Sequence, residues 1–290
     1  MPELCWAART DVGRRRAKNE DAFTAATPIF AVADGMGGHA RGDVAAAMAI
    51  DALRTVPPTF QRTELLEAIR QAHQEISRLA AETGGLGMGT TLTGIAFGGA
   101  RDGALLVFNV GDSRVYRLRA GALEQLTHDH SVVQELLDAG DITEADIATH
   151  PERNVVTRSL GDGGHLAIDW HQTNTVDGDR YLVCSDGLVK EVDDDAIGAI
   201  LADHDPTAAA EGLIERALAN GGRDNVTVAV VEVIRARRTT DGEAGRAAAA
   251  PDADGIDADT NPRAAPRVAP GRGQLDVDTR PTAGTIGPRP

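Results

Sequence analysis

The sequence lacks long apolar segments. Among its 290 residues no run of 18 apolar residues occurs, and a helix needs about that length to cross a bilayer. Residues 9–18 are strongly charged, so the first segment does not resemble the apolar stretch of a secretory signal. We therefore expect a cytoplasmic protein without a membrane anchor.

The sequence also has few cysteines, and fewer basic than acidic residues. The two cysteines, Cys5 and Cys184, both lie inside apolar, strand-like runs. This predicts small core side chains in a reducing compartment rather than a disulfide framework. Lysine and arginine number 29 against 44 aspartates and glutamates, a net charge of −15. This balance argues against partners such as nucleic acid or anionic membranes and suits a domain that gathers divalent cations.

Residues 237–290 lack the side chains that a folded core needs. They contain seven of the thirteen prolines, no aromatic residue and only five large aliphatic residues. Such a segment buries too little apolar surface to offset the entropy lost on ordering. We predict one folded domain over residues 1–236, followed by a disordered tail rich in alanine, proline, glycine, aspartate and arginine.

Short strand-like runs dominate the predicted domain, and helical segments come in pairs. Amphipathic helices are expected at 43–54 and 63–82, and again at 193–203 and 206–220. Asp102-Gly103 and Ala120-Gly121 separate neighbouring apolar runs, which is a hairpin signal. This order predicts an α+β fold rich in antiparallel strands. The strand-like runs are 4–9, 21–25, 29–33, 90–98, 104–110, 114–119, 166–172, 179–185 and 226–234.

A polar segment at 127–160 interrupts the strands. It contains two short helical stretches, 131–139 and 143–148. His128 and His130 could suggest zinc, but neither a cysteine pair nor an H-E-x-x-H sequence accompanies them. A loop is therefore the favoured interpretation.

Four aspartates each end or follow an apolar run, in turns marked by glycine or asparagine. Two carboxylates about 4 Å apart repel by about 4 kcal/mol at an effective dielectric constant of about 20, so a fold that gathers them needs positive charge. Oxygen ligands without cysteine or histidine favour Mg²⁺ or Mn²⁺. The alternative for any single site is ordinary turn chemistry. The four residues are Asp34, Asp112, Asp186 and Asp224.

Six ordered motifs carry a resemblance to a known family. They are T-D-x-G-x-x-R-x-x-N-E-D at 10–21, A-D-G-M-G-G-H at 33–39, G-M-G-T-T at 87–91, G-D-S-R at 111–114, S-D-G-L at 185–188 and D-N-V-T at 224–227. Together they resemble the metal-dependent protein phosphatase family, the type 2C class of serine/threonine phosphatases. The residues within the motifs resemble those of the family's bacterial branch. The match is collinear from about residue 4 to residue 235.

The resemblance implies a fold, an activity and partners. The fold would be a four-layer α-β-β-α sandwich, with two antiparallel sheets flanked by pairs of helices and with 127–160 as a mobile flap beside the active site. The activity would be hydrolysis of phosphoserine and phosphothreonine by in-line attack of a hydroxide bridging two Mn²⁺ or Mg²⁺ ions, without a covalent intermediate. The partners would be phosphorylated proteins, among them a bacterial serine/threonine kinase and its substrates.

The resemblance also implies roles for the metal ligands. Asp34 would bridge both metal ions, and Asp186 and Asp224 would complete the first site. The carbonyl of Gly35 would join the second site, and a glycine there would let the backbone approach the metal. The second site would also involve Asp21 and Glu20, acting through ordered waters.

Further roles concern phosphate and a third, weaker metal site. Arg16 is the expected phosphate clamp, because a guanidinium can hold two phosphate oxygens at once. The alternative is that the R-R-R run at 14–16 is a solvated basic loop. A third metal site would involve Asp112, Asp186 and the flap residue Asn154.

One departure from the family pattern concerns the proton donor. Eukaryotic members often place a histidine where this chain has Met36. His39 is nearby in sequence, but a metal-bound water or no dedicated acid is favoured over it. The leaving alkoxide needs some proton source.

Two other functions remain open. One is a catalytically weak module that binds phosphoproteins, although Asp34, Gly35, Asp186 and Asp224 are all retained. The other is a phosphatase dedicated to one regulator, such as a phosphorylated anti-sigma antagonist, or to a small phosphoester. Cys184 lacks the C-x₅-R pattern of a cysteine phosphatase, so a thiol nucleophile is not expected.

Overall fold

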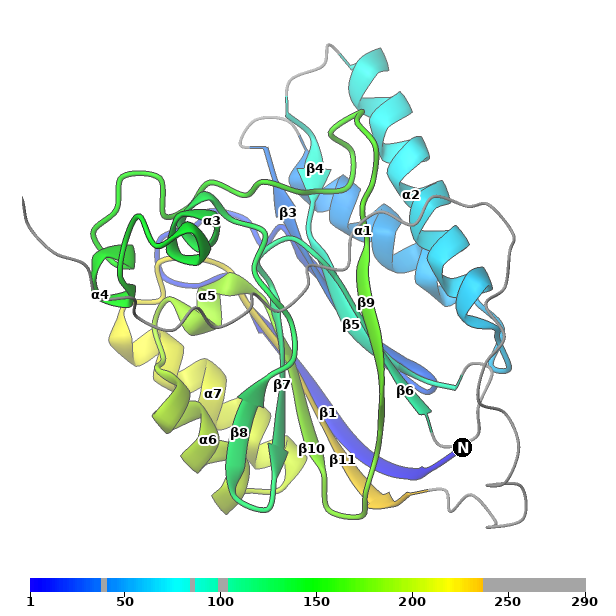
Figure 1. Ribbon diagram of the computed structural model, residues 1–290, viewed down its shortest axis with the longest axis vertical. Coiled ribbons are helices and arrows are strands. Elements are labelled where there is room, and N and C mark those ends of the chain that lie inside the picture. Colours follow the sequence, from blue (N-terminus) through cyan, green and yellow to red (C-terminus); the bar gives the residue numbers. More distant parts are fainter. Residues whose placement is uncertain (38–40, 84–86, 99–103, 237–290) are drawn as a thin grey trace, which may run out of the picture. The chain divides into compact units, whose positions relative to one another are not determined.

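The structure is a computed structural model that describes residues 1–37, 41–83, 87–98 and 104–236 (Figure 1). The predicted proton-donor candidate His39, the Asp102-Gly103 turn and the tail 237–290 lie outside the described residues, so the disorder of the tail stays a prediction. Within the described ranges, no helix combines the length and apolar character needed to cross a membrane.

Two antiparallel sheets form the centre of the fold. The first has the order β1-β11-β10-β7-β8 and the second the order β2-β3-β5-β6-β9, with the short β4 paired to β3. Every strand pair is antiparallel. The strands are β1 (Glu3–Asp11), β2 (Asp21–Ala26), β3 (Ile29–Met36), β4 (Gly89–Thr90), β5 (Leu92–Phe97), β6 (Ala104–Val110), β7 (Arg114–Arg119), β8 (Ala122–Gln125), β9 (Asp169–Asn174), β10 (Arg180–Cys184) and β11 (Val226–Arg235).

Helices cover the outer faces of both sheets. Figure 1 shows α1 (Gly42–Arg54) and α2 (Arg62–Glu82) on one outer side and α6 (Asp194–Asp203) and α7 (Pro206–Asn220) on the other. Each predicted helix begins and ends within one residue of its observed bounds. The remaining helices are short: α3 (Val132–Ala139), α4 (Glu144–Ile147) and α5 (Asp186–Val189).

Three apolar layers hold this arrangement together. The middle layer joins the two sheets, with Phe30 and Phe97 from one sheet and Tyr181 from the other in edge-to-face contact. The alternate residues of the same strands pack against the helices outside. Because strands buried on both faces need apolar residues at both parities, the continuous runs of β3 and β11 follow directly. The predicted four-layer α-β-β-α sandwich is confirmed.

The prediction that Cys5 is a core residue is wrong. Cys184 is buried in the central strand β10, but Cys5 is exposed near the start of β1. β1 is an edge strand of its sheet, and an edge strand has a neighbour on one side only. An apolar run at an edge looks the same in sequence as one at the centre.

The segment 127–160 contains both of its predicted short helices, α3 and α4. Ser131 caps the start of α3 by accepting a hydrogen bond from the backbone N–H of Gln134, and Gly140 ends the helix with a left-handed backbone. In Figure 1 these helices lie beside α5.

Candidate active site

Strand ends from both sheets bring five aspartates together. Asp21 and Asp34 are cross-strand partners on β2 and β3 of one sheet. Asp186 follows β10 and Asp224 precedes β11 in the other, while Asp112 lies in the turn between β6 and β7. Burial raises the pKa of Asp34 well above its ordinary value, and the charges of the other four aspartates raise it further. These carboxylates therefore share one electrostatic site.

Asp21 joins the two sheets at this site. Its Oδ2 atom accepts hydrogen bonds from Ser185 Oγ at 2.9 Å and from Thr227 Oγ1 at 2.7 Å. Burial raises the pKa of Asp21 to about 7, although the two hydroxyl groups act in the opposite direction. Its other oxygen, Oδ1, is buried and has no hydrogen-bond partner among the described residues, so within this part of the chain it is available to a ligand.

Two threonines fix the backbone of Asp34. Its N–H donates to Thr91 Oγ1, and its carbonyl accepts from Thr91 N and from Thr90 Oγ1, each at 2.9 Å. No role was predicted for these threonines from the sequence. The T-T pair in the G-M-G-T-T motif was the available signal, because a hydroxyl beside a strand end can bind a neighbouring backbone.

Gly35 is required by packing at the start of α1. A Cβ atom there would lie 2.4 Å from the carbonyl carbon and oxygen of Gly42 and 2.6 Å from the carbonyl oxygen of Glu20. The glycine was expected to let the backbone approach a metal, and these close contacts are a steric reason for it that involves no metal. The carbonyl of Glu20 also accepts a hydrogen bond of 3.2 Å from Gly35 N, so the observed contact of Glu20 is made by its backbone.

Arg16, the residue expected to clamp phosphate, lies at this site. Its Nε and Nη2 atoms contact Oδ1 and Oδ2 of Asp224, both at 2.8 Å. Hydrogen bonding to Asp224 is the main cause of the raised pKa of Arg16. About half of the side chain is exposed (51%). The guanidinium thus already presents the two-pronged geometry that binds a pair of anionic oxygens.

Asn225 holds the loop that carries Arg16. Its Nδ2 atom donates to the carbonyls of Val12 and Lys18, each at 2.9 Å, and its Oδ1 accepts from Glu20 N at 2.9 Å. The asparagine of the D-N-V-T motif therefore orients a segment some 200 residues earlier in the chain. These hydrogen bonds of Asn225 bring Arg16 close to Asp224, the residue that precedes Asn225 in the chain.

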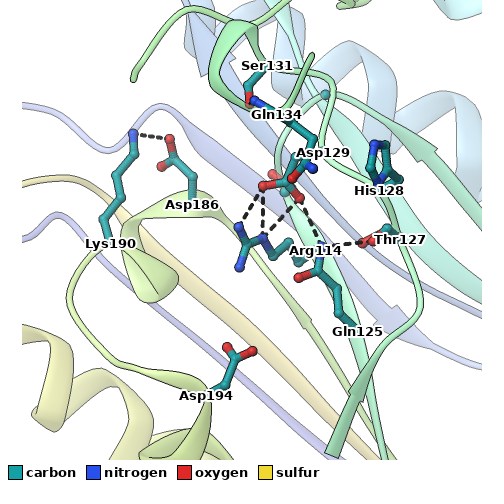
Figure 2. Close-up of polar contacts among 12 residues, drawn as sticks. Arg114, Gln125, Thr127, His128, Asp129, Ser131, Gln134, Asp186, Lys190 and Asp194 are labelled. Atoms are coloured by element: carbon teal, nitrogen blue, oxygen red, sulfur yellow. Dashed lines mark hydrogen bonds and ion pairs between the residues drawn. The ribbon is translucent and has the colours of Figure 1, made fainter. Parts of the chain in front are cut away.

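Lys190 is a second cation that the sequence analysis missed. Its ammonium forms an ion pair with Asp186 Oδ2 (Figure 2). The other oxygen of Asp186, Oδ1, is buried, and no group in the described part of the chain forms a hydrogen bond with it. The four-residue spacing of the two in S-D-G-L-V-K was the available signal, since such residues lie on one side of a helical turn.

The donor set suits a hard divalent cation. Within the described ranges the site offers carboxylates and no cysteine or histidine, and two of its buried carboxylate oxygens, on Asp21 and Asp186, lack partners there. In the part of the chain that the structure describes, however, no three histidine, cysteine or acidic side chains form a ready cage for a metal ion. Arg16 and Lys190 instead pair with two of the carboxylates. The chemistry of the donors and the mutual repulsion of the carboxylates nevertheless favour binding of a divalent cation.

A cavity of about 630 Å³ lies beside the carboxylates. Arg16, Asp112, Asp186 and Asp224 line one part of it, and the 127–160 segment lines another through residues that include Asn154. Asn154 is exposed and, among the contacts of the described residues, none joins its side chain to Asp112 or Asp186. Burial is the main reason that the pKa of Asp112 rises to about 7.

A buried ion pair ties the 127–160 segment to the turn that carries Asp112. Arg114 binds Asp129 through Nε and Nη2, at distances of 2.7 to 3.0 Å, as Figure 2 shows. Nη1 of the same guanidinium donates to the hydroxyl of Tyr116, which donates in turn to Asp194. The fourth residue of G-D-S-R thus anchors the segment.

The two histidines of this segment have separate partners. His130 Nδ1 accepts from Gly111 N at 3.0 Å, which leaves Nε2 to donate to Asp169 at 3.1 Å. His128 lies 2.7 Å from Asp138. Because each histidine faces a different carboxylate, the loop interpretation fits the structure better than zinc binding.

Comparison with known proteins gives the class that this fold and site define. The family model described as protein phosphatase 2C matches residues 13–220, and the chain belongs to that family. The chain is 42% identical over 236 residues to the serine/threonine protein phosphatase PstP of Mycobacterium tuberculosis, covering 80% of this chain and 45% of that protein. It thus spans less than half the length of that relative.

Other relatives match over nearly their whole length. The serine/threonine phosphatase stp of Listeria monocytogenes is 38% identical over 239 residues, which cover 77% of this chain and 94% of that protein. The crystal structure of the catalytic domain of PstP in complex with two manganese ions has a TM-score of 0.73 at 40% identity, covering 80% of this chain and 98% of that one. The predicted family and its bacterial branch are confirmed.

Proposed function

We propose that this chain is a Mn²⁺- or Mg²⁺-dependent phosphatase that dephosphorylates serine and threonine residues of proteins. The observation that carries the proposal is that five aspartates converge: the charges of four of them raise the pKa of the fifth, Asp34. Beside them, the guanidinium of Arg16 binds both carboxylate oxygens of Asp224. Three of these aspartates, Asp112, Asp186 and Asp224, line a cavity of about 630 Å³. Family membership and the manganese-containing structure of the relative PstP support the same activity.

Asp34, the Gly35 carbonyl, Asp186 and Asp224 would hold two metal ions. When bound, such ions acidify water, orient a phosphate and screen its charge. The buried Oδ1 of Asp21, which has no partner among the residues that the structure describes, supports a role for this residue through ordered water, with Glu20 as its neighbour in the same role. Residues 1–236 would form the catalytic domain and contain all the residues that take part in the reaction.

Arg16 would hold the phosphate group. Its guanidinium is half exposed, and Asp224 occupies its fork in the structure. A phosphate monoester presents oxygens of the same charge and spacing. If the phosphate replaced Asp224 on the guanidinium of Arg16, the phosphorus atom would be held next to the carboxylates. Most of the catalytic effect would then come from positioning and charge.

The proton for the leaving serine or threonine would come from water. No histidine is among the described residues that line the cavity, and the motif position of a catalytic histidine is occupied by Met36. Water is therefore the favoured proton donor for the leaving alkoxide. His39, the candidate from the motif at 33–39, stays the alternative.

The substrates would be cytoplasmic phosphoproteins, among them the targets of a bacterial serine/threonine kinase and that kinase itself. The 127–160 segment contributes Glu144, Ile147 and Arg153 to the cavity wall. This mixture of acidic, apolar and basic side chains would contact the residues on either side of the phosphorylated one. It would act as a flap whose movement admits the peptide.

The test is phosphate release from a phosphothreonine peptide, with Mn²⁺ or with EDTA. Wild type should turn over only with Mn²⁺, and Asp34→Asn should be inactive, because it removes a ligand charge without changing size. Asp51→Asn, an exposed carboxylate on α1 paired with Arg54, is the matched control and should stay active. Peptide binding without turnover by wild type under any metal would instead favour a phosphoprotein-binding module.

A further inference from the structure

Lys190 is fixed to the carboxylate site by its position in the chain. It follows the one-turn helix α5, and its backbone N–H donates to the carbonyl of Asp186 at 3.0 Å. The same helical turn directs the side chain back, so that the ammonium meets Asp186 Oδ2, as Figure 2 shows. An ion pair closed within one turn of the backbone needs little rearrangement to form.

The ammonium lies among several carboxylates rather than in solvent. Two thirds of the Lys190 side chain is covered, with 33% exposed, and Asp186 is more buried still. Lys190, Asp112 and Asp186 all line the same cavity. The ion pair with Asp186 therefore places the positive charge of the lysine in the space that the two carboxylates share.

We propose that the ammonium of Lys190 takes the place of a third divalent cation between Asp112 and Asp186, so that this site binds two metal ions and no more. The inference rests on the proposed function, in which Asp34, Asp186 and Asp224 hold the first two. It replaces the expectation of a third metal site at Asp112, Asp186 and Asn154.

The charge of the site supports this assignment. The five aspartates that interact electrostatically carry five negative charges when all are ionised. Two divalent cations and Lys190 balance these five charges. Arg16, which pairs with Asp224 in the structure, then adds the positive charge that a phosphate would neutralise. A third divalent cation would leave a surplus of positive charge next to an ammonium, which like-charge repulsion opposes.

Competition between a tethered and a free cation favours the lysine. A group held by a short linker acts at an effective concentration on the order of millimolar. A third Mn²⁺ would have to displace Lys190 from Asp186 at that effective concentration. Asn154, the remaining ligand expected for that site, is exposed and has no contact with either carboxylate among those of the described residues.

The test counts bound metal ions rather than activity. The metal-free full-length chain is dialysed to equilibrium against Mn²⁺ from micromolar to millimolar concentration, and bound Mn²⁺ is measured by elemental analysis. Wild type should saturate at two ions per chain. Lys190→Met, which has a similar length without the charge, should bind a third and weaker ion. Lys190→Arg keeps the cation and should stay at two.

A double variant locates the additional ion. Asp112→Asn in the Lys190→Met background should return the count to two, because it removes the other carboxylate of the site. Matching circular dichroism spectra and melting curves show that each variant is folded. Three ions in wild type, or only two in Lys190→Met at millimolar Mn²⁺, would overturn the inference alone. A wild type that binds no Mn²⁺ would overturn the proposed function as well.

Discussion

Arg16 and Asp224 are 208 residues apart in the chain, yet two nitrogens of one meet both carboxylate oxygens of the other. Each contact is 2.8 Å long. Asn225 makes this pairing possible, because it binds the backbone on both sides of Arg16 at Val12 and Lys18. The neighbouring Arg15 belongs to the same basic run but has no such contact among those of the described residues.

Replacing Arg16 by lysine should therefore reduce activity although the charge is kept. A lysine offers a point charge and loses one of two charge-assisted hydrogen bonds. The loss of one such bond, at about 1.5–3 kcal/mol, corresponds to roughly a tenfold to hundredfold fall in kcat/KM. The measurement is hydrolysis of a phosphothreonine peptide at saturating Mn²⁺. Arg15→Lys is the control and should stay within about twofold; equal losses in both variants would contradict the clamp.

Gly35 and Gly212 should respond to the same substitution in opposite ways. Gly35→Ala places a Cβ 2.4 Å from the backbone of Gly42, and overpacking of this kind costs about 1–3 kcal/mol. Gly212 lies in α7, where the nearest atom to an added Cβ is 3.6 Å away, so alanine should add up to about 1 kcal/mol of helix propensity. Denaturant unfolding measures both, and a stable Gly35→Ala would contradict the close approach.

The stability of the metal-free chain should fall as pH rises from about 4 to 7. Burial is the main cause that raises the pKa of Asp21 and Asp112 to about 7, against about 3.9 in an unfolded chain. Between these values the folded state binds more protons than the unfolded state. The free energy of unfolding therefore decreases with increasing pH across that window.

Thermal unfolding in EDTA at the two pH values measures this effect. His171 acts in the opposite direction, because burial lowers its pKa and its stabilising effect is lost as pH falls. The Asp21→Asn variant separates the two, since it removes one acid and leaves His171 in place. Its melting temperature should depend less on pH than that of wild type. A steeper decline in the variant would contradict the assignment.

Deletion of residues 240–290 should leave the chemistry intact. The sequence of this segment cannot build a core, so turnover of a small phosphoester should change by less than about threefold. The comparison is made at equal Mn²⁺ with the full-length chain. A collapse of activity would mean that the tail contributes to the site.

The sequence predicted the helices and most strands because their signals are local. Asp193 and Asp205 cap α6 and α7 through hydrogen bonds to nearby backbone N–H groups, and glycine turns mark the strand ends where the aspartates lie. β8 and α5 were missed, since A-L-E-Q has no distinctive period and a single turn of helix has almost none.

The supporting contacts of the site could not be predicted in the same way. Thr91 binds Asp34 across 57 residues, and Thr227 binds Asp21 across 206. Such contacts depend on which strands become neighbours, and a hydroxyl group on a strand carries no mark of its partner. Lys190 was missed for a different reason, because a lysine four residues after an aspartate is common on helix surfaces.

The placement of Asp21 and Asp34 on one sheet and of Asp186 and Asp224 on the other has a mechanical consequence. Their mutual distances are set by the alignment of two separate sheets, which the aromatic side chains of Phe30, Phe97 and Tyr181 lock together from the interior. A slight sliding of one layer over the other would spread the carboxylates apart without altering any of them. Metal affinity would thus report on the packing of a core that never contacts the metal.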